Sequence, residues 1–210
     1  MANKYLPIGL AVANQKCLVV GGGKIALRKI DNLLDYDTDI TVIAPETEDK
    51  IGYYAERGRI KLEKRPYQPP EAGQYNLVIS ASDDKAVNQQ VYDDAVAAGV
   101  PVNVVDNPPL CTFIFPAVTK RNCLTVAVST DGQAPFLAGY LRMVLDDIFP
   151  ERWRRIADYA ARFRDLVREE GPKGSEQKTA CLQKFLAADW KTMLKKQSEE
   201  EIEAEMRSWL

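Results

Sequence analysis

The sequence predicts an α/β fold, in which a parallel sheet with crossover helices is followed by a small α+β unit and a helical C-terminal unit. Short apolar runs alternate with helical patterns from Cys17 to Asp106, as is typical of a parallel sheet. After Asp106 come two runs that suit antiparallel strands, and from Glu151 onward the apolar spacing is helical. We therefore expect three parts, namely residues 1–113, 114–149 and 150–210.

Five short apolar runs are the candidate strands of the parallel sheet. They are Cys17–Val20, Ile40–Ile43, Ile60–Lys64, Leu77–Ala81 and Val102–Val105. Apolar residues recur at helical spacing in 26–34 and in 86–96, which predicts two helices that each direct one face to a core. In a sheet of order 3-2-1-4-5, strands one, four and five end side by side, and ligands bind outside those carboxyl ends.

The second and third parts are predicted from a change of pattern. Two strands are expected at Thr112–Val118 and Leu124–Ser129, followed by a helix that starts near Pro135 and stops before Phe149-Pro150. An apolar stripe along residues 153–167 predicts another helix, and the Gly-Pro-Lys-Gly run at 171–174 separates it from two more. The strongly charged residues 192–210 are expected to fray.

The composition is that of an ordinary globular protein and excludes several classes of function. Of the 210 residues, 46% are hydrophobic and 28% are charged, with a formal net charge of -2, so the chain has no general attraction for nucleic acid. Histidine is absent, which excludes His-dependent triads and the H-E-x-x-H metal site. The four cysteines form no C-x-x-C pair, so we expect no metal site. Proton transfer must use a carboxylate, lysine, tyrosine, cysteine or water.

The N-terminal segment contains an Ala-x-Ala at Ala11 to Ala13, which raises the question of a secretory signal. Pro7 and Gly9 interrupt its apolar run, so a signal is not expected. No stretch approaches the roughly 18 consecutive apolar residues that span a bilayer. We expect a soluble, cytoplasmic protein with neither a membrane nor a nucleic acid as partner.

A glycine-rich turn follows the first strand and fits the pattern G-x-G-x-x-A. The first glycine of that pattern permits a tight turn, the second lets the backbone approach a pyrophosphate, and the small third residue lets the helix pack on the strand. Phosphates then lie at the helix N-terminus, where free N–H groups and the dipole favour anions. A strand precedes the turn and a helix follows it, so we expect a Rossmann-type dinucleotide site. The residues of the turn are Gly21, Gly22, Gly23, Lys24, Ile25 and Ala26.

The choice between NAD and NADP stays open at this point. The second strand ends in Ala44-Pro45, without the acidic residue that usually binds the adenosine ribose. Glu46 lies just beyond and either reaches the ribose from the loop or is a solvated surface charge. Arg28 and Lys29 in the first helix either suit a 2′-phosphate or are exposed helix charges.

Two further segments are expected beside the glycine turn, after strands four and five. In the first, Ser82 or Asp83 is favoured as the N-cap of the following helix. In the second, Asp106 precedes Asn107 and two prolines, and no helical pattern follows. Asp106 is either a carboxylate held at the mouth of the crevice or a turn-forming residue, and the local sequence favours neither.

Seven short motifs occur in order along the chain, namely the runs 6–8, 17–29, 81–88, 103–106, 113–117, 127–132 and 135–142. This ordered set resembles the precorrin-2 dehydrogenase family, which is the dehydrogenase module of sirohaem synthase. The resemblance covers residues 5 to 145, and beyond them the chain matches only as a helical tail. Two departures are Ala134-Pro135, where the family commonly has Ser-Pro, and an extra proline between Asp106 and Phe113.

The resemblance implies a cytoplasmic homodimer with an NAD-binding domain at residues 1–113, a dimerisation unit at 114–149 and a helical C-terminal unit at 150–210. It also implies conversion of precorrin-2 to sirohydrochlorin with NAD as hydride acceptor, and some relatives insert ferrous iron as a secondary activity. The family's important aspartate falls on Asp106, which favours a catalytic role as base or as a charge that orients the substrate. Cofactor contacts fall on Gly22, Gly23, Lys24, Ile25, Pro45 and Glu46, and we add Gly21 and Ser82 to the predicted site.

A polycarboxylate substrate also needs cations, and Lys120, Arg121 and Arg142 belong to the unit expected to form a wall of the crevice. The main alternative is a non-catalytic domain that binds NAD and reports redox state to a partner. Such a domain would share the glycine turn but would not need Asp106. A short-chain dehydrogenase is disfavoured, because no tyrosine has a lysine four residues later.

Overall fold

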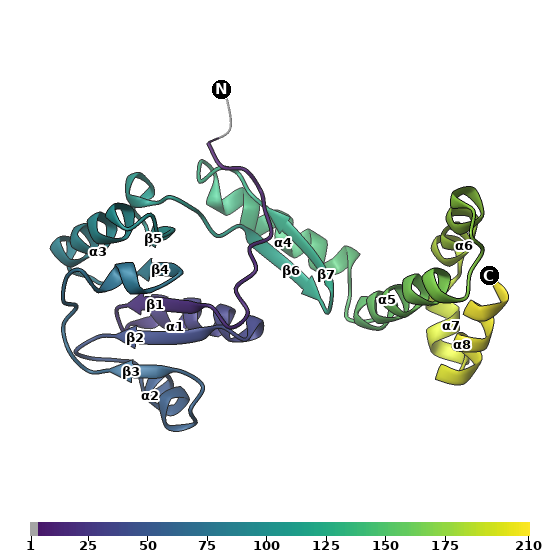
Figure 1. Cartoon of the computed structure of the whole chain (residues 1–210), viewed down its shortest axis with the longest axis horizontal. Helices are drawn as coiled ribbons and strands as arrows, with labels where there is room; N and C mark the ends of the chain where they lie inside the picture. The colour runs from purple at the N-terminus through teal and green to yellow at the C-terminus, as the bar shows by residue number, and fades with distance from the viewer. Residues whose placement is uncertain (1–3) are drawn as a thin grey trace. The chain divides into compact units, whose positions relative to one another are not determined.

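The computed structural model describes residues 4–210, and the chain divides into two compact units, Met1–Phe115 and Pro116–Leu210. The first unit holds a parallel sheet with its helices, and the second holds an antiparallel strand pair and the remaining helices (Figure 1). Within residues 4–210, no helix is both long enough and apolar enough to cross a membrane.

The sheet of the first unit has five parallel strands in the order β3-β2-β1-β4-β5 (Figure 1), which confirms the expected order. Residues alternate between its two faces, so that Cys17 and Val19 of β1 enter one core cluster while Leu18 and Val20 enter the other. Both faces are covered, and the strands therefore read as continuous apolar runs. The strands are β1 (Lys16–Val20), β2 (Asp39–Ile43), β3 (Lys61–Glu63), β4 (Leu77–Ser80) and β5 (Val102–Val104).

Helices α1 (Lys24–Leu33) and α3 (Lys85–Ala97) are the two that the apolar spacing predicted. Helix α1 buries Ala26, Ile30 and Leu33 of its expected stripe, whereas α3 buries Val91 and Ala95 but leaves Ala86 and Val96 exposed. Helix α2 (Asp49–Glu56) was not predicted. Its one buried residue is Ile51, so the sequence there carries no apolar repeat that indicates a helix. Short 3₁₀ helices also occur at η1 (Leu34–Tyr36), η2 (Glu71–Gln74) and η3 (Pro108–Leu110).

The strand predicted at Thr112–Val118 is wrong. The chain after η3 returns along the edge of β5, where Cys111 forms an antiparallel bridge with Asn103 and the Thr112 N–H donates to the Val102 carbonyl at 2.9 Å. The strand of the second unit, β6 (Ala117–Arg121), begins only after Pro116. The run 112–118 has the composition of a strand, but Pro116 has no N–H group to donate to a neighbouring strand. The segment that pairs with β5 therefore ends before Pro116, and β6 begins after it.

In the second unit, β6 pairs with β7 (Leu124–Val128), and α4 (Pro135–Ile148) contacts both strands. Helix α4 starts and ends where predicted. Beyond residue 174 three helices form instead of two, and the expected fraying is wrong. Helix α8 begins with a capping box at Ser198 and Glu201 and buries Ile202 and Met206. The C-terminal helices are α5 (Trp153–Glu169), α6 (Ser175–Ala187), α7 (Trp190–Lys196) and α8 (Glu199–Ser208).

Candidate functional site

The glycine turn between β1 and α1 is enclosed by two neighbouring backbone segments. Gly21 has a φ of 116°, and a Cβ there would overlap the carbonyl oxygen of Ala81, after β4. A Cβ at Gly22 would overlap the carbonyl oxygen of Glu46, after β2. These overlaps are with backbone atoms, which cannot rotate away, so both positions need glycine for packing of the fold itself.

Gly23 differs from its two neighbours, because a Cβ there would have no atom within 4 Å. Gly23 is the N-cap of α1 and supplies no side-chain cap, so the first-turn N–H groups of the helix are not capped by a side chain. Gly23, Lys24 and Ile25 are exposed, whereas Ala26 is fully buried. The turn therefore offers open space and free N–H donors where a dinucleotide places its pyrophosphate, and these residues fit that group.

The loop after β2 is tied to the glycine turn by hydrogen bonds. The Gly21 N–H donates to the Ile43 carbonyl at 3.0 Å, and the Glu48 N–H donates to the Gly22 carbonyl at 2.8 Å. Pro45 and Glu46 lie between these two bonds, and both are exposed. The predicted cofactor residues of the first and second strand ends are therefore neighbours in the structure.

The loop after β4 contains Ser82, and its neighbour Asp84 is the N-cap of α3. The Asp84 carboxylate accepts from the N–H groups of Ala86 and Val87 at 2.8 and 3.4 Å. The expectation that Ser82 or Asp83 is the cap is therefore wrong. The extended backbone of Asp84 directs its side chain toward the N–H groups of the first helical turn. The Ser82 hydroxyl does not cap the helix, because it accepts a hydrogen bond from the Asp84 N–H.

Asn88 holds this loop in place, a role that the sequence reasoning missed. Its side-chain amide donates to the Ser82 carbonyl at 2.8 Å, and its oxygen accepts from the Ser80 hydroxyl at 2.6 Å. Ser80 is fully buried, and Asn88 is one of the buried residues of α3. The only available signal was a polar residue on the apolar stripe of the predicted helix.

Asp106 follows β5 and is exposed, with a φ of 57°. Aspartate and asparagine tolerate this left-handed conformation better than most residues, and the Asn107 N–H closes the turn on the Val104 carbonyl at 3.2 Å. The turn-forming role and the exposed carboxylate are therefore compatible. Val20 pairs with Ser80 and Ser80 with Val104, so the glycine turn, the Ser82 loop and the Asp106 turn leave the sheet at the same edge.

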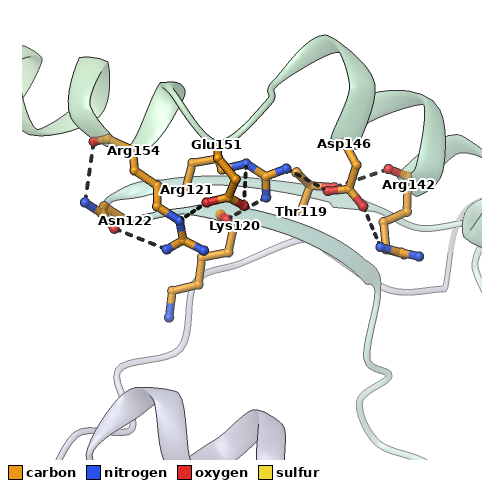
Figure 2. A network of polar contacts seen from close by, with 8 residues as sticks. All are labelled: Thr119, Lys120, Arg121, Asn122, Arg142, Asp146, Glu151 and Arg154. Carbon is orange, nitrogen blue, oxygen red and sulfur yellow. Dashed lines mark hydrogen bonds and ion pairs between the residues drawn. The ribbon is translucent and has the colours of Figure 1, made fainter.

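The three predicted substrate cations lie in the second unit, and Figure 2 shows that they do not converge on one point. Arg121 is buried and donates to Asp146 at 3.1 Å, with Glu151 at 3.7 Å. Arg142 donates to the other oxygen of Asp146 at 2.6 Å. Lys120 extends from the opposite face of β6, away from these carboxylates (Figure 2). The charge of Arg121 is thus compensated within its own unit.

Within residues 4–210, no three His, Cys, Asp or Glu side chains are grouped so that they could hold a metal ion. The buried thiol of Cys17 has a pKa raised to about 12 by desolvation, so this cysteine is protonated at neutral pH and chemically inert. At the carboxyl ends of the parallel strands, Asp106 follows β5 and has an exposed carboxylate.

Comparison with known proteins agrees with this geometry. A family model described as "Putative NAD(P)-binding" matches residues 8–117. "Siroheme synthase" of Methylococcus capsulatus is 44% identical over 169 residues, which are 80% of this chain and 36% of that protein. "Siroheme synthase" of Nitrosococcus oceani is 40% identical over 166 residues, which are 79% of this chain and 36% of that protein. The chain thus spans about a third of the length of these curated relatives.

Among solved structures, the fold is similar to that of a chain titled "SirC, precorrin-2 dehydrogenase". The TM-score is 0.79 at 23% sequence identity, and the match covers 97% of this chain and 100% of that one. This likeness extends over both units and confirms the architecture, namely a Rossmann-type sheet, a small α+β unit and a helical C-terminal part.

Proposed function

Because this chain belongs to the NAD(P)-binding family whose model covers residues 8–117, we propose that it is an enzyme that oxidises precorrin-2 to sirohydrochlorin with NAD. The observation that carries the proposal is a contrast within the glycine turn. Backbone atoms fill the space beside Gly21 and Gly22, whereas the space beside Gly23 is empty and can accept the pyrophosphate. The exposed Asp106 carboxylate at the same sheet edge adds a group that a purely nucleotide-binding domain would not need. The names of the sirohaem synthase relatives and of the similar structure support this substrate.

In the proposed reaction, residues of the first unit bind the cofactor, orient the substrate or accept a proton. The first-turn N–H groups after Gly23 bind the pyrophosphate, and Asn88 fixes the Ser82 loop beside it. NAD, when bound, supplies the acceptor for the hydride that leaves a carbon of the tetrapyrrole. The oxidation also releases a proton, and the Asp106 carboxylate either accepts it and passes it to water or orients the substrate while water accepts it.

The charges after β2 favour NAD over NADP. Glu46, Glu48 and Asp49 follow that strand within five residues of Ala44, and Glu46 adjoins the glycine turn. A 2′-phosphate would bring at least one further negative charge next to these carboxylates, whereas a ribose 2′-hydroxyl can donate a hydrogen bond to one of them. We therefore assign the Glu46 loop to the ribose.

Two cations of the second unit are proposed to bind carboxylates of the substrate. Arg142 keeps 42% of its side chain exposed although it is paired with Asp146, and Lys120 lies on the face of β6 opposite the buried arginine (Figure 2). Arg121, at 10% exposed, is instead proposed to act through Asp146, which it holds in place for Arg142.

The test of the proposed function is a turnover assay with enzymatically prepared precorrin-2. With NAD we expect NADH to form in step with the absorption spectrum of sirohydrochlorin, and with NADP we expect a much lower rate. Binding of NAD without any turnover would instead identify a nucleotide-sensing domain. Addition of ferrous iron to the completed reaction tests for the secondary ferrochelatase activity, which would change the spectrum to that of sirohaem.

We further propose that the chain is a homodimer that associates through α4. Phe136, Tyr140 and Met143 are 82%, 61% and 59% exposed. Their spacing places them on one face of the helix. Soluble proteins rarely leave a contiguous apolar face of this kind uncovered. A two-fold symmetric contact buries the same face of both copies at once. A second copy of this chain can therefore cover the apolar α4 face without any other protein.

Replacing the apolar α4 face with charge should dissociate the dimer. The double variant Phe136→Glu, Tyr140→Glu should give the 23.5 kDa of one chain by light scattering at micromolar concentration, and the wild type should give twice that mass. Leu186→Glu is the matched control, because Leu186 is 79% exposed but belongs to α6. A wild-type monomer, or dissociation by the Leu186 variant alone, would contradict the α4 interface.

A further inference from the structure

Lys29 lies on the second turn of α1 and is not an exposed helix charge. Its side chain is half-buried, and Nζ lies 4.0 Å from the centroid of the Phe115 ring. Phe115 packs edge-on against Phe113, with ring centroids 5.2 Å apart, and both rings pack on the core cluster beneath α1. The ammonium group is therefore held over an aromatic surface rather than moving in solvent.

This ammonium group lacks a close counter-ion. Among residues 4–210, no carboxylate forms an ion pair with it within 4.0 Å. Burial lowers the pKa of Lys29, the neighbouring charge of Arg28 lowers it further, and the negative charge of Asp106 opposes these effects. A half-buried cation in this position is stabilised by an added anion, because the anion replaces the hydration that the protein has removed.

The position of Lys29 indicates which anion it binds. Phe115, whose ring contacts this ammonium group, and Asp106, whose charge acts on it, both belong to the segment that follows β5, whereas the Glu46 loop follows β2. In the sheet order, β5 and β2 lie on opposite sides of β1. The ammonium therefore lies on the Asp106 side of the glycine turn and not on the ribose side, which disfavours the 2′-phosphate interpretation.

We propose that Lys29 binds a carboxylate of the tetrapyrrole substrate and thereby anchors it next to Asp106. This inference rests on the proposed function and extends it, because the substrate cations expected from the sequence all lie in the second unit. Phe113 and Phe115 supply an apolar surface beside the cation, which suits a ligand whose carboxylates are attached to a largely apolar macrocycle.

The test compares Lys29→Met with Lys29→Arg. Methionine keeps an unbranched apolar stem that can still pack on Phe115, whereas arginine keeps the charge. We expect Lys29→Met to weaken equilibrium binding of sirohydrochlorin, measured by absorbance titration without NAD, by about 10-fold or more, which is typical of a lost hydrogen bond to a charged group. KM for precorrin-2 should rise similarly, with kcat and NAD affinity nearly unchanged, and Lys29→Arg should restore most of the binding.

Lys50→Met is the matched control, because Lys50 Nζ also lies over a ring, 5.3 Å from the centroid of Tyr54, and in the same unit. It should bind sirohydrochlorin as the wild type does. A lower melting temperature of Lys29→Met with unchanged tetrapyrrole binding would show a purely structural role and overturn the inference. Loss of NADP or NAD affinity in place of tetrapyrrole affinity would overturn it as well. If the wild type binds no tetrapyrrole, the proposed function itself fails, and the inference fails with it.

Discussion

Asp106→Asn should lower turnover about 10²- to 10⁴-fold if the carboxylate accepts the proton of the oxidation. The amide has nearly the same size, and asparagine tolerates the φ of 57° at this position, so the turn after β5 should keep its conformation. NAD affinity and melting temperature should therefore stay close to those of the wild type. Steady-state rates with precorrin-2, calorimetric titration with NAD and thermal unfolding measure the three quantities.

The distribution of the loss distinguishes the two chemical roles of Asp106. A fall in kcat indicates proton transfer, whereas a smaller effect confined to KM indicates placement of the substrate. Asp37→Asn is the matched control, because Asp37 also has a left-handed backbone, with a φ of 50°, but precedes β2 at the other end of the sheet. Full activity of folded Asp106→Asn would remove this residue from the mechanism, and unfolding of the variant would leave it only the turn-forming role.

Gly23→Val should strongly weaken NAD binding and leave the fold intact. The new Cβ would meet no protein atom within 4 Å, and the extended backbone of Gly23 is accessible to valine. The branched side chain would instead occupy the space of the pyrophosphate and block the first-turn N–H groups. Loss of two hydrogen bonds to a charged group corresponds to an affinity decrease of about 10²-fold or more, which calorimetry can detect.

Gly22→Val provides the contrasting control one residue earlier. Its Cβ would overlap the carbonyl oxygen of Glu46, so the strand end, the glycine turn or the loop after β2 must move. We expect this variant to lose several kcal/mol of stability, as overpacking against backbone does. If folded Gly23→Val binds NAD as tightly as the wild type, the dinucleotide does not lie on this turn.

The sequence by itself was sufficient to predict the parallel sheet and its order, the glycine turn at 21–26, helix α4 and the position of Asp106 at the end of β5. Each of these depends on local signals. Apolar runs of strand length, helical spacing, prolines and glycines limit the backbone over a few residues, and the connection rules for parallel strands then determine which strand ends are neighbours.

The tertiary structure decided the features that depend on contacts between residues distant in the sequence. Two adjacent glycines look alike in the motif, but the approach of the loop after β2 makes Gly22 necessary for packing and leaves Gly23 open. The run predicted as a strand at 112–118 divides at Pro116, because its first residues pair with the edge of β5. The ammonium of Lys29 is held by Phe115, which is far along the chain, so helical spacing alone could not distinguish it from a solvated charge.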